Sequence, residues 1–179
     1  MEYLKRFIKN ILGFIVFLRF KNIWNLKKYL KDNNIDSGIN ASIYYDYLDK
    51  KGSYIGHTSY FKSVPYFPHG LNGIFISDKA NIGKNAIIYQ QVTIGSINTK
   101  GSKNIGSPTI GDNCYIGAGA KILGKIKIGN NCRIGANAVV AKDMPDNSVA
   151  YVSNTIIKVK NTKMDNKYYK PSELDEAGE

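Results

Sequence analysis

The sequence predicts an all-β fold, a parallel β-helix built of three-sided coils, with a short helical segment in front of it. Glycine is frequent, with 17 residues among 179, and isoleucine is abundant, which favours β-structure with many tight turns over a helical bundle. The decisive observation is a six-residue period that runs without exception through Ile110, Ile116, Ile122, Ile128, Ile134 and Val140.

A period of six fits neither the 3.6 residues of a helical turn nor the alternation of a simple strand. Gly and Asn follow many of the aliphatic residues, and both tolerate left-handed backbone conformations, so each unit predicts a short strand that ends in a turn. Three such units close a triangle with the aliphatic side chains inside, and stacked triangles form a parallel β-helix. Cys114 and Cys132 occupy the small inward position three units apart and are expected to stack in the core.

The same period extends towards the N-terminus, which predicts a β-helix over residues 51–160. An upstream block contains Ile76, Ile82, Ile88 and Ile94, and a weaker block contains Ile55, Phe61 and Phe67. The step from Ile94 to Ile110 is sixteen residues, which is not a multiple of six. Residues 95–109 are therefore expected to be looped out of the coils.

The two flanks differ from the repeat. Residues 1–50 are predicted to be helical, because apolar residues recur every three or four positions from Leu4 to Leu18 with lysines and arginines between them. The segment "NNIDSGIN" breaks this pattern, and "YYDYLDKKG" leads without a clear pattern into the first coil. Residues 161–179 form a tail with an acidic end that is expected to be partly disordered.

The apolar run from Ile11 to Leu18 is shorter than the roughly 20 residues that span a bilayer, and "RFKN" follows it where a signal peptide would have a small-residue cleavage site. Two cysteines without a CxxC motif indicate a reducing compartment, so the cytoplasm is the expected location. Residues 1–31 carry eight Lys and Arg against one Glu, which suits contact with the inner face of a membrane; packing against the rest of the protein is an equal alternative.

A net charge of +11 predicts an anionic partner, such as cofactor phosphates, a lipid surface or nucleic acid, unless it reflects only a general Lys-rich bias. No nucleic-acid-binding module or motif of interleaved aromatic and basic residues is present, so nucleic acid is not expected as a partner. The chain has two histidines and no third that matches them, which argues against a catalytic metal held by three protein ligands.

Three stretches resemble one family: "VTIG" at 92–95, "IGDNCYIGAGAKILG" at 110–124 and "IGANAVVAKDMP" at 134–145. They are similar to the left-handed β-helix, or hexapeptide-repeat, acyltransferases. The most similar branch is the serine-acetyltransferase-like branch, which includes bacterial saccharide and polysaccharide O-acetyltransferases. The resemblance covers about residues 52–158. It implies a left-handed β-helix, a homotrimer, and acetyl-CoA as co-substrate in a groove between neighbouring β-helices.

Carried over by position, the resemblance places the catalytic histidine at His69, in the segment "YFPHGLNGIF". The alternative is that His69 is only a residue of a Pro-His-Gly turn. The cofactor positions fall at Gly95 and Ser96 beside the acetyl group, Ala118 and Ala136 along the pantetheine arm, and Lys142 and Lys158 near the CoA phosphates. Small residues let an extended cofactor lie against backbone. The lysine positions rest on charge alone, and solvated surface lysines are equally expected.

The implied reaction is transfer of acetyl from CoA to an acceptor hydroxyl. A hydroxyl is a poor nucleophile until a base accepts its proton, and imidazole suits that task near neutral pH. A backbone N–H near Gly95 is the expected donor to the oxyanion. Tyr54 stands where serine acetyltransferases have an Asp that orients the histidine, so a backbone carbonyl is expected to orient His69 instead. The other histidine, His57, is expected on the surface of an early coil.

Three departures count against serine as acceptor. These are Tyr54, the presence of Ser107 where serine acetyltransferases have a second histidine, and a helical segment far shorter than theirs. The sequence therefore predicts a saccharide acceptor, in surface-polysaccharide biosynthesis. Two alternatives stay open: a serine O-acetyltransferase, and a non-catalytic trimeric scaffold or binding module.

Overall fold

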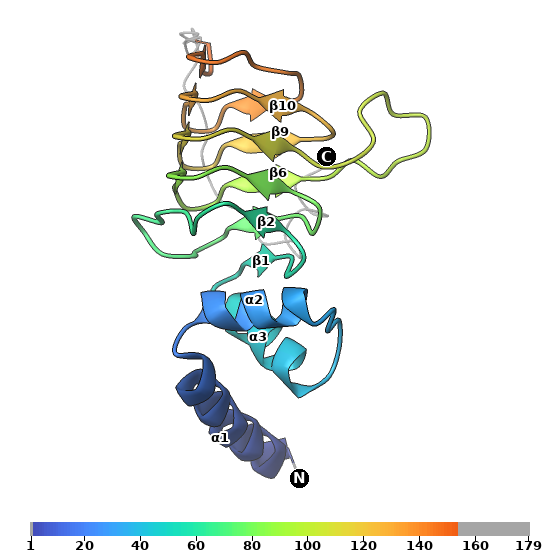
Figure 1. Cartoon of the computed structure of the whole chain (residues 1–179), viewed down its shortest axis with the longest axis vertical. Helices are drawn as coiled ribbons and strands as arrows, with labels where there is room; N and C mark the ends of the chain where they lie inside the picture. The colour runs from blue at the N-terminus through green and yellow to red at the C-terminus, as the bar shows by residue number, and fades with distance from the viewer. Residues whose placement is uncertain (1, 154–179) are drawn as a thin grey trace, which may run out of the picture.

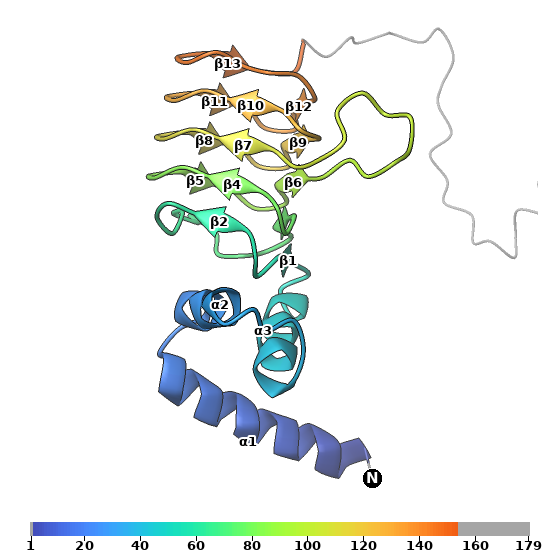
Figure 2. The ribbon, with the colours of Figure 1, turned by 45° about the vertical axis from the view of Figure 1, so that its right-hand side comes forward.

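Three helices followed by a three-sided prism of short strands make up the structure, a computed structural model that describes residues 2–153 (Figure 1). The helices are α1 (Glu2–Phe20), α2 (Ile23–Asp32) and α3 (Ile39–Asp49). They lie at one end of the prism, below its first coil, and α1 extends furthest from it (Figures 1 and 2). The last coil closes at the opposite end with β13 (Val149–Ala150).

The strands are two or three residues long and alternate with turns, as the six-residue period predicts. Those before β13 are β1 (Tyr54–Ile55), β2 (Tyr60–Phe61), β3 (Phe75–Ile76), β4 (Asn81–Ile82), β5 (Ile87–Ile88), β6 (Thr93–Gly95), β7 (Thr109–Ile110), β8 (Tyr115–Ile116), β9 (Lys121–Leu123), β10 (Lys127–Ile128), β11 (Arg133–Ile134) and β12 (Val139–Val140).

These strands form three parallel sheets, one for each face of the prism (Figure 2). Sheet A has the order β1-β3-β6-β9-β12, sheet B the order β10-β7-β4-β2, and sheet C the order β13-β11-β8-β5. The repeat residues stack in register: in sheet A, Ile76 pairs with Ile94 and Ile94 with Ile122, and all three are fully buried. The predicted fold, a left-handed parallel β-helix with short N-terminal helices, is confirmed.

The turns that join sheet B to sheet C show why Asn and Gly recur. Asn85, Asn113, Asn131 and Asn147 all have φ between 55° and 57°, in the left-handed region. Each side-chain amide of the first three donates to the amide oxygen of the next, at 3.0, 3.1 and 3.2 Å. Gly111, at the start of one such turn, has no room for a side chain, because an added Cβ would lie 2.7 Å from Asn130 Oδ1. The coils are therefore joined along this edge by side chains as well as by strands.

Cys114 and Cys132 are both buried free thiols, as expected for core positions. Each Sγ lies 3.2 Å from a carbonyl oxygen of the next coil, that of Gly129 for Cys114 and that of Pro145 for Cys132. Burial raises the pKa of the Cys114 thiol. These cysteines act as small core residues.

The helices α2 and α3 cover the open end of the first coil. Their buried residues include Leu26 and Leu30 from α2 and Tyr44 and Leu48 from α3, and the Tyr44 hydroxyl donates to the Ile55 carbonyl at 2.8 Å. The end of a β-helix exposes apolar side chains that must be covered. The stretch "YYDYLDKKG", which showed no clear pattern in the sequence, lies mostly in α3 for this reason.

His57 is buried, with 5% of its surface exposed, so the expectation of a surface residue was wrong. Its Nδ1 lies 2.7 Å from the Tyr45 hydroxyl of α3, and its Nε2 lies 3.1 Å from an Asp36 carboxylate oxygen. The Lys27 ammonium of α2 donates to the carbonyls of His57 and Ser59 at 3.0 and 2.6 Å. Polar contacts therefore join the helices to the first coil, where the sequence alone showed only an exposed turn.

No described helix is both long enough and apolar enough to cross a bilayer. The division into segments 1–50, 51–160 and 161–179 stays a prediction, and the tail from residue 154 lies outside the described residues.

Candidate active site

His69 lies on the edge of the prism where sheet C passes into sheet A. The preceding Tyr66 bridges to Ile87 of sheet C, and the following strand, β3, belongs to sheet A. A tight turn holds the residue: the Gly70 N–H donates to the Phe67 carbonyl at 3.0 Å, with Gly70 at φ +68°. The side chain of His69 is exposed at this turn.

The imidazole of His69 is oriented by Gln90, from the turn one coil further along the same edge. Nδ1 lies 2.7 Å from Gln90 Oε1, and the ring meets the ring of Tyr89 edge-on at 5.4 Å between centroids. An amide oxygen only accepts hydrogen bonds, so this contact requires the proton on Nδ1. The neutral ring then carries its lone pair on Nε2, the nitrogen that a general base uses.

The expectation of a backbone carbonyl as the orienting group was therefore wrong, because a side chain takes that place. Gln90 stands two residues before "VTIG", and only the stacking of coils brings it to a residue 21 positions earlier. The register of the coils, rather than the local sequence, determines this contact.

The two predicted pantetheine positions lie on the same edge as His69. Successive turns bond there through the backbone, from Gln91 N–H to Asn72 carbonyl (3.0 Å), Gly119 N–H to Gln90 carbonyl (3.0 Å) and Asn137 N–H to Ala118 carbonyl (2.8 Å). Ala136 adjoins Asn137 and is exposed, and Ala118 is partly exposed. We name this edge, with His69, Gln90, Ala118 and Ala136, the histidine edge.

Aromatic and cationic side chains flank the histidine edge on sheet C. The ring of Tyr89 lies 5.2 Å from that of Tyr115, and the Arg133 guanidinium lies over Tyr115 at 5.8 Å. A hydrogen bond with Tyr115 raises the pKa of the Tyr89 hydroxyl. Arg133 is a cation that sequence reasoning did not select. The sequence gives only one indication of its role, which is that Arg133 occupies an outward-facing position of the repeat.

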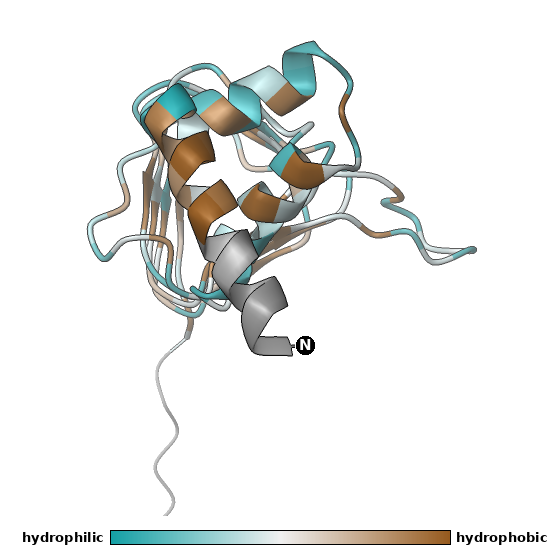
Figure 3. Cartoon of the chain, turned by 90° about the horizontal axis from the view of Figure 1, so that it is seen from below, coloured by the Kyte–Doolittle hydropathy of each residue, from teal (hydrophilic) through white to brown (hydrophobic). Residues whose placement is uncertain are grey.

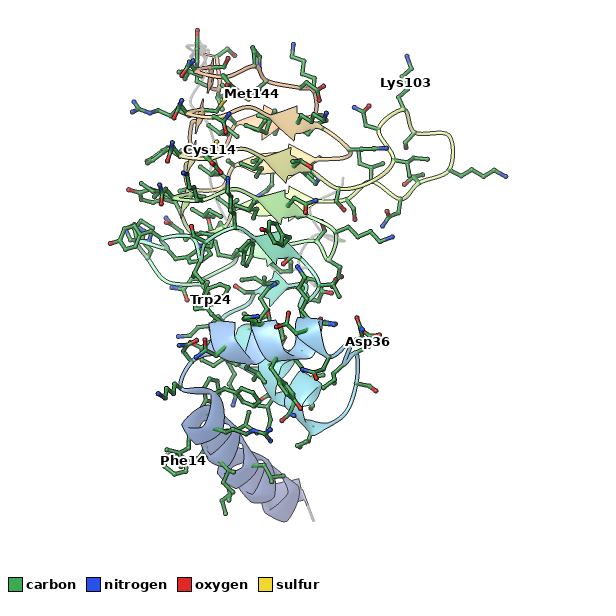
Figure 4. The ribbon with its side chains drawn as sticks, in the orientation of Figure 1. Phe14, Trp24, Asp36, Lys103, Cys114 and Met144 are labelled. Carbon is green, nitrogen blue, oxygen red and sulfur yellow. The ribbon has the colours of Figure 1, made fainter. Side chains whose placement is uncertain are left out.

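Gly95 and Ser96 lie on a different edge, where sheet A passes into sheet B. The segment between β6 and β7 leaves the prism here as a projecting loop whose outer part includes Lys103 (Figures 1 and 4). Ile97 and Gly106 close the base of the loop by exchanging two backbone hydrogen bonds, at 3.0 and 2.9 Å. The projecting loop lies between Gly95 and Thr109, and the predicted division of the chain around it stays a prediction.

A cavity of about 560 Å³ lies at the base of this loop. Its lining includes Gly95 and Ser96 from the end of β6 and Ser107 from the returning strand of the loop. Ser77 and Ser107 place their hydroxyl oxygens 3.3 Å apart, and Phe75 contributes a half-exposed aromatic ring. We name this edge, with its cavity, the loop edge.

Tyr54, which the sequence resemblance aligns with an orienting Asp, lines the same cavity. Its hydroxyl donates to an Asp78 carboxylate oxygen at 2.7 Å, and its ring stacks on that of Tyr45 at 5.5 Å. Burial first, and then the hydrogen bond to Asp78, raises the pKa of the Tyr54 hydroxyl. Asp78 puts a carboxylate into the cavity, and sequence reasoning missed it because the pair spans 24 positions.

One chain does not bring all the predicted site residues together. His69, Ala118 and Ala136 lie on the histidine edge, whereas Gly95 and Ser96 lie on the loop edge. Lys142 follows β12 of sheet A at the last coil, and it lines a separate hollow with Val139 and Tyr151. Lys158 lies outside the described residues.

Among residues 2–153 no group of three or more His, Cys, Asp or Glu side chains could hold a metal ion.

Comparisons with known proteins identify similar chains. Residues 107–142 match the family of bacterial transferase hexapeptide repeats (six repeats). The chain is 49% identical over 77 residues to a serine acetyltransferase of Mycobacterium tuberculosis, which covers 43% of this chain and 33% of the relative. It is 35% identical over 102 residues to a serine acetyltransferase of Bacillus pumilus, covering 57% and 46%.

Solved structures show the same similarity. Serine acetyltransferase isoform 3 of Entamoeba histolytica, in complex with cysteine, superimposes with a TM-score of 0.65 at 26% identity, over 78% of this chain and 50% of that one. The chain thus spans between a third and a half of the length of these relatives. It carries the hexapeptide repeat of bacterial transferases on a left-handed β-helix, and in both sequence and fold it is similar to serine acetyltransferases.

Proposed function

We propose that this protein is an acetyl-CoA-dependent O-acetyltransferase in which His69 is the general base. The observation that carries the proposal is the orientation of His69. Its Nδ1 is held by Gln90 on an edge where Ala118 and Ala136 leave the backbone open to an extended ligand. The relatives are acetyltransferases, which supports acetyl-CoA as the donor.

The chemistry follows from the free lone pair on Nε2. The acceptor hydroxyl gives its proton to Nε2 while its oxygen attacks the thioester carbonyl carbon. A backbone N–H beside Gly95 donates to the oxyanion of the tetrahedral intermediate. The intermediate then expels the CoA sulfur, which takes the proton back from the imidazolium. The product is an acetyl ester and the histidine returns to its neutral form.

A homotrimer would complete the site. The histidine edge and the loop edge are different edges of one prism, so a single chain presents two half-sites that face away from each other. In a cyclic assembly the same two surfaces meet at every interface, one from each neighbour. The histidine edge of one copy then meets the loop edge of the next, and the ring contains three complete sites. The cofactor groove would lie between neighbours. The cytoplasm, where acetyl-CoA is made and used, remains the proposed location.

The comparisons favour serine as the acceptor, because the similar proteins are named serine acetyltransferases. The cavity of the loop edge gives a specific reason to keep a saccharide as the second candidate. It presents the hydroxyls of Ser77, Ser96 and Ser107 and the ring of Phe75. It also contains Asp78, whose carboxylate can accept hydrogen bonds from sugar hydroxyls.

The test is thiol release from acetyl-CoA with L-serine and with a panel of monosaccharides, nucleotide sugars and surface glycans, followed by mass spectrometry of the products. Acetylation of L-serine alone assigns the serine activity, and acetylation of a sugar alone assigns the saccharide activity. Binding of acetyl-CoA without turnover on any acceptor would favour the non-catalytic scaffold. His69→Ala is the control for turnover that does not use the proposed base.

A further inference from the structure

The outer face of α1 is apolar although the helix is folded against the rest of the protein. Ile11, Phe14, Ile15 and Leu18 are 45%, 67%, 53% and 65% exposed. Their spacing of three and four residues puts them on one side of the helix. We name these four residues the α1 apolar face. Figure 3, viewed from the helical end of the molecule, shows the hydrophobic colour concentrated on this part of α1, and Figure 4 shows Phe14 projecting from it.

This exposure does not result from a detached helix. On its other side α1 buries Val16 and Phe20. Phe17 contacts Tyr47 of α3 with 5.4 Å between ring centroids, and Phe20 contacts Tyr29 of α2 at 4.9 Å. The helix is therefore anchored to α2 and α3 by one side, which fixes the direction in which the apolar face points.

Exposed cations lie next to the C-terminal end of this face. Residues 1–31 contain eight Lys and Arg against a single Glu. Arg19 and Lys21, at the end of α1, are both exposed, and the Arg19 guanidinium is held over the rings of Phe20 and Tyr29 at 5.2 and 5.5 Å. An apolar strip bordered by cations complements a lipid surface that has an apolar interior and anionic headgroups.

We propose that the α1 apolar face docks the protein on an anionic lipid surface, with α1 lying in the plane of the headgroups. The strip from Ile11 to Leu18 is too short to span a bilayer, and no described helix meets the requirements for a span, so the contact is peripheral. The excess of cations favours lipid over a second copy of this chain, because a second copy would bring the same positive charge to the interface.

The proposal is independent of the acceptor, but its strength depends on the proposed trimer. In a cyclic trimer the three α1 helices lie at the same end of the assembly, so all three apolar faces reach one membrane together. Once one α1 apolar face is bound, the other two are held close to the same membrane at a high effective concentration. Three weak contacts of one trimer therefore bind the membrane more tightly than one contact alone.

The test is flotation of the full-length protein with vesicles of phosphatidylcholine alone and with vesicles of equimolar phosphatidylcholine and phosphatidylserine. We expect flotation only with the anionic vesicles and release as salt is raised. The double variant Phe14→Asp/Leu18→Asp should lose at least about tenfold in bound fraction, because two carboxylates replace the inserted side chains. The matched control is Val149→Asp/Val152→Asp, which replaces two valines that are 61% and 55% exposed at the opposite end, and it should float like the wild type.

A second variant separates charge from apolar insertion. Arg19→Gln/Lys21→Gln keeps the α1 apolar face and should bind anionic vesicles more weakly with a shallower salt dependence. Circular dichroism and light scattering verify that each variant is folded and has the wild-type oligomeric state. The proposal is overturned if the wild type does not float with anionic vesicles, or if Phe14→Asp/Leu18→Asp floats unchanged. It is also overturned if the sole effect of Phe14→Asp/Leu18→Asp, measured by light scattering without lipid, is loss of self-association.

Discussion

The histidine edge and the loop edge are built by opposite means. The histidine edge consists of regular turns whose backbones bond from coil to coil, and its single reactive side chain, His69, is held by a neighbour in the stack. The loop edge is made where the repeat is interrupted, and its cavity is lined by residues from β1, β3, β6 and the loop. The comparison teaches that the regular edge supplies precise placement, while the interrupted edge supplies the shape of a pocket.

The largest expected effect concerns the reactive group of the histidine edge. His69→Ala should lower kcat by roughly 10²–10⁴-fold, the range typical of a lost general base, while the oligomeric state and acetyl-CoA affinity stay unchanged. Steady-state kinetics, light scattering and ligand-induced thermal shift measure the three quantities. His57→Ala is the matched control, since it should lower thermal stability through the lost buried hydrogen bond with Tyr45 yet keep kcat. Near-normal turnover by folded His69→Ala would mean that His69 is only a turn residue.

The second prediction tests whether the two edges act across an interface. A chain carrying His69→Ala and a chain in which residues 98–104 are replaced by two glycines should each be nearly inactive alone. Co-expressed, they should recover about one quarter of wild-type activity, because a random ring pairs an intact histidine edge with an intact loop edge at one interface in four. Activity that stays at the level of the single variants would place the complete site within one chain.

The third prediction separates orientation from reactivity on the histidine edge. Gln90→Leu removes the partner of Nδ1 and should lower kcat by about tenfold with little change in KM, because the ring loses its fixed tautomer and direction. In Gln90→Glu a carboxylate beside Nδ1 stabilises the imidazolium, so the acid limb of the kcat profile should move to higher pH. A purely structural role for Gln90 would change thermal stability and leave the pH profile of Gln90→Glu unchanged.

The smallest expected effect lies below both edges, where the helices meet the first coil. Burial, followed by the charge of Lys31, lowers the pKa of Lys27 from 10.5 to about 8. Between these two pH values the unfolded chain binds more protons at this residue than the folded chain, so its contribution to stability should rise with pH. We therefore expect the stability of the wild type relative to Lys27→Met to increase from about pH 8 to about pH 10.5 in denaturant titrations. A flat difference would contradict the lowered pKa.

The coils could be predicted from sequence because every unit repeats the same local rule. Ile94 and Ile122 each predict a strand, and Asn113 predicts a turn, without reference to one another. Their common six-residue period predicts that the units stack as coils. The same rule predicts a loop at residues 95–109, because a step of sixteen residues cannot be part of a period of six.

Contacts between coils could not be predicted in this way. Gln90 meets His69 and Asp78 meets Tyr54 only after the register is set, and neither pair has a sequence spacing with any local meaning. The burial of His57 was missed for a related reason. It depends on Tyr45 and on α3, and α3 is stabilised by covering the coil rather than by a strong pattern of its own.

The backbone hydrogen bonds between successive turns give the histidine edge a regular spacing. Each coil advances by one inter-strand spacing of about 4.8 Å, and the backbone bonds from Asn72 through Gln90 and Ala118 to Asn137 mark three such steps. The backbone of the turn at Asn137 therefore lies about 14 Å along this edge from that of the turn at Asn72, whatever side chains lie between them. An inserted or deleted coil would change the length of this edge only in whole steps of about 4.8 Å.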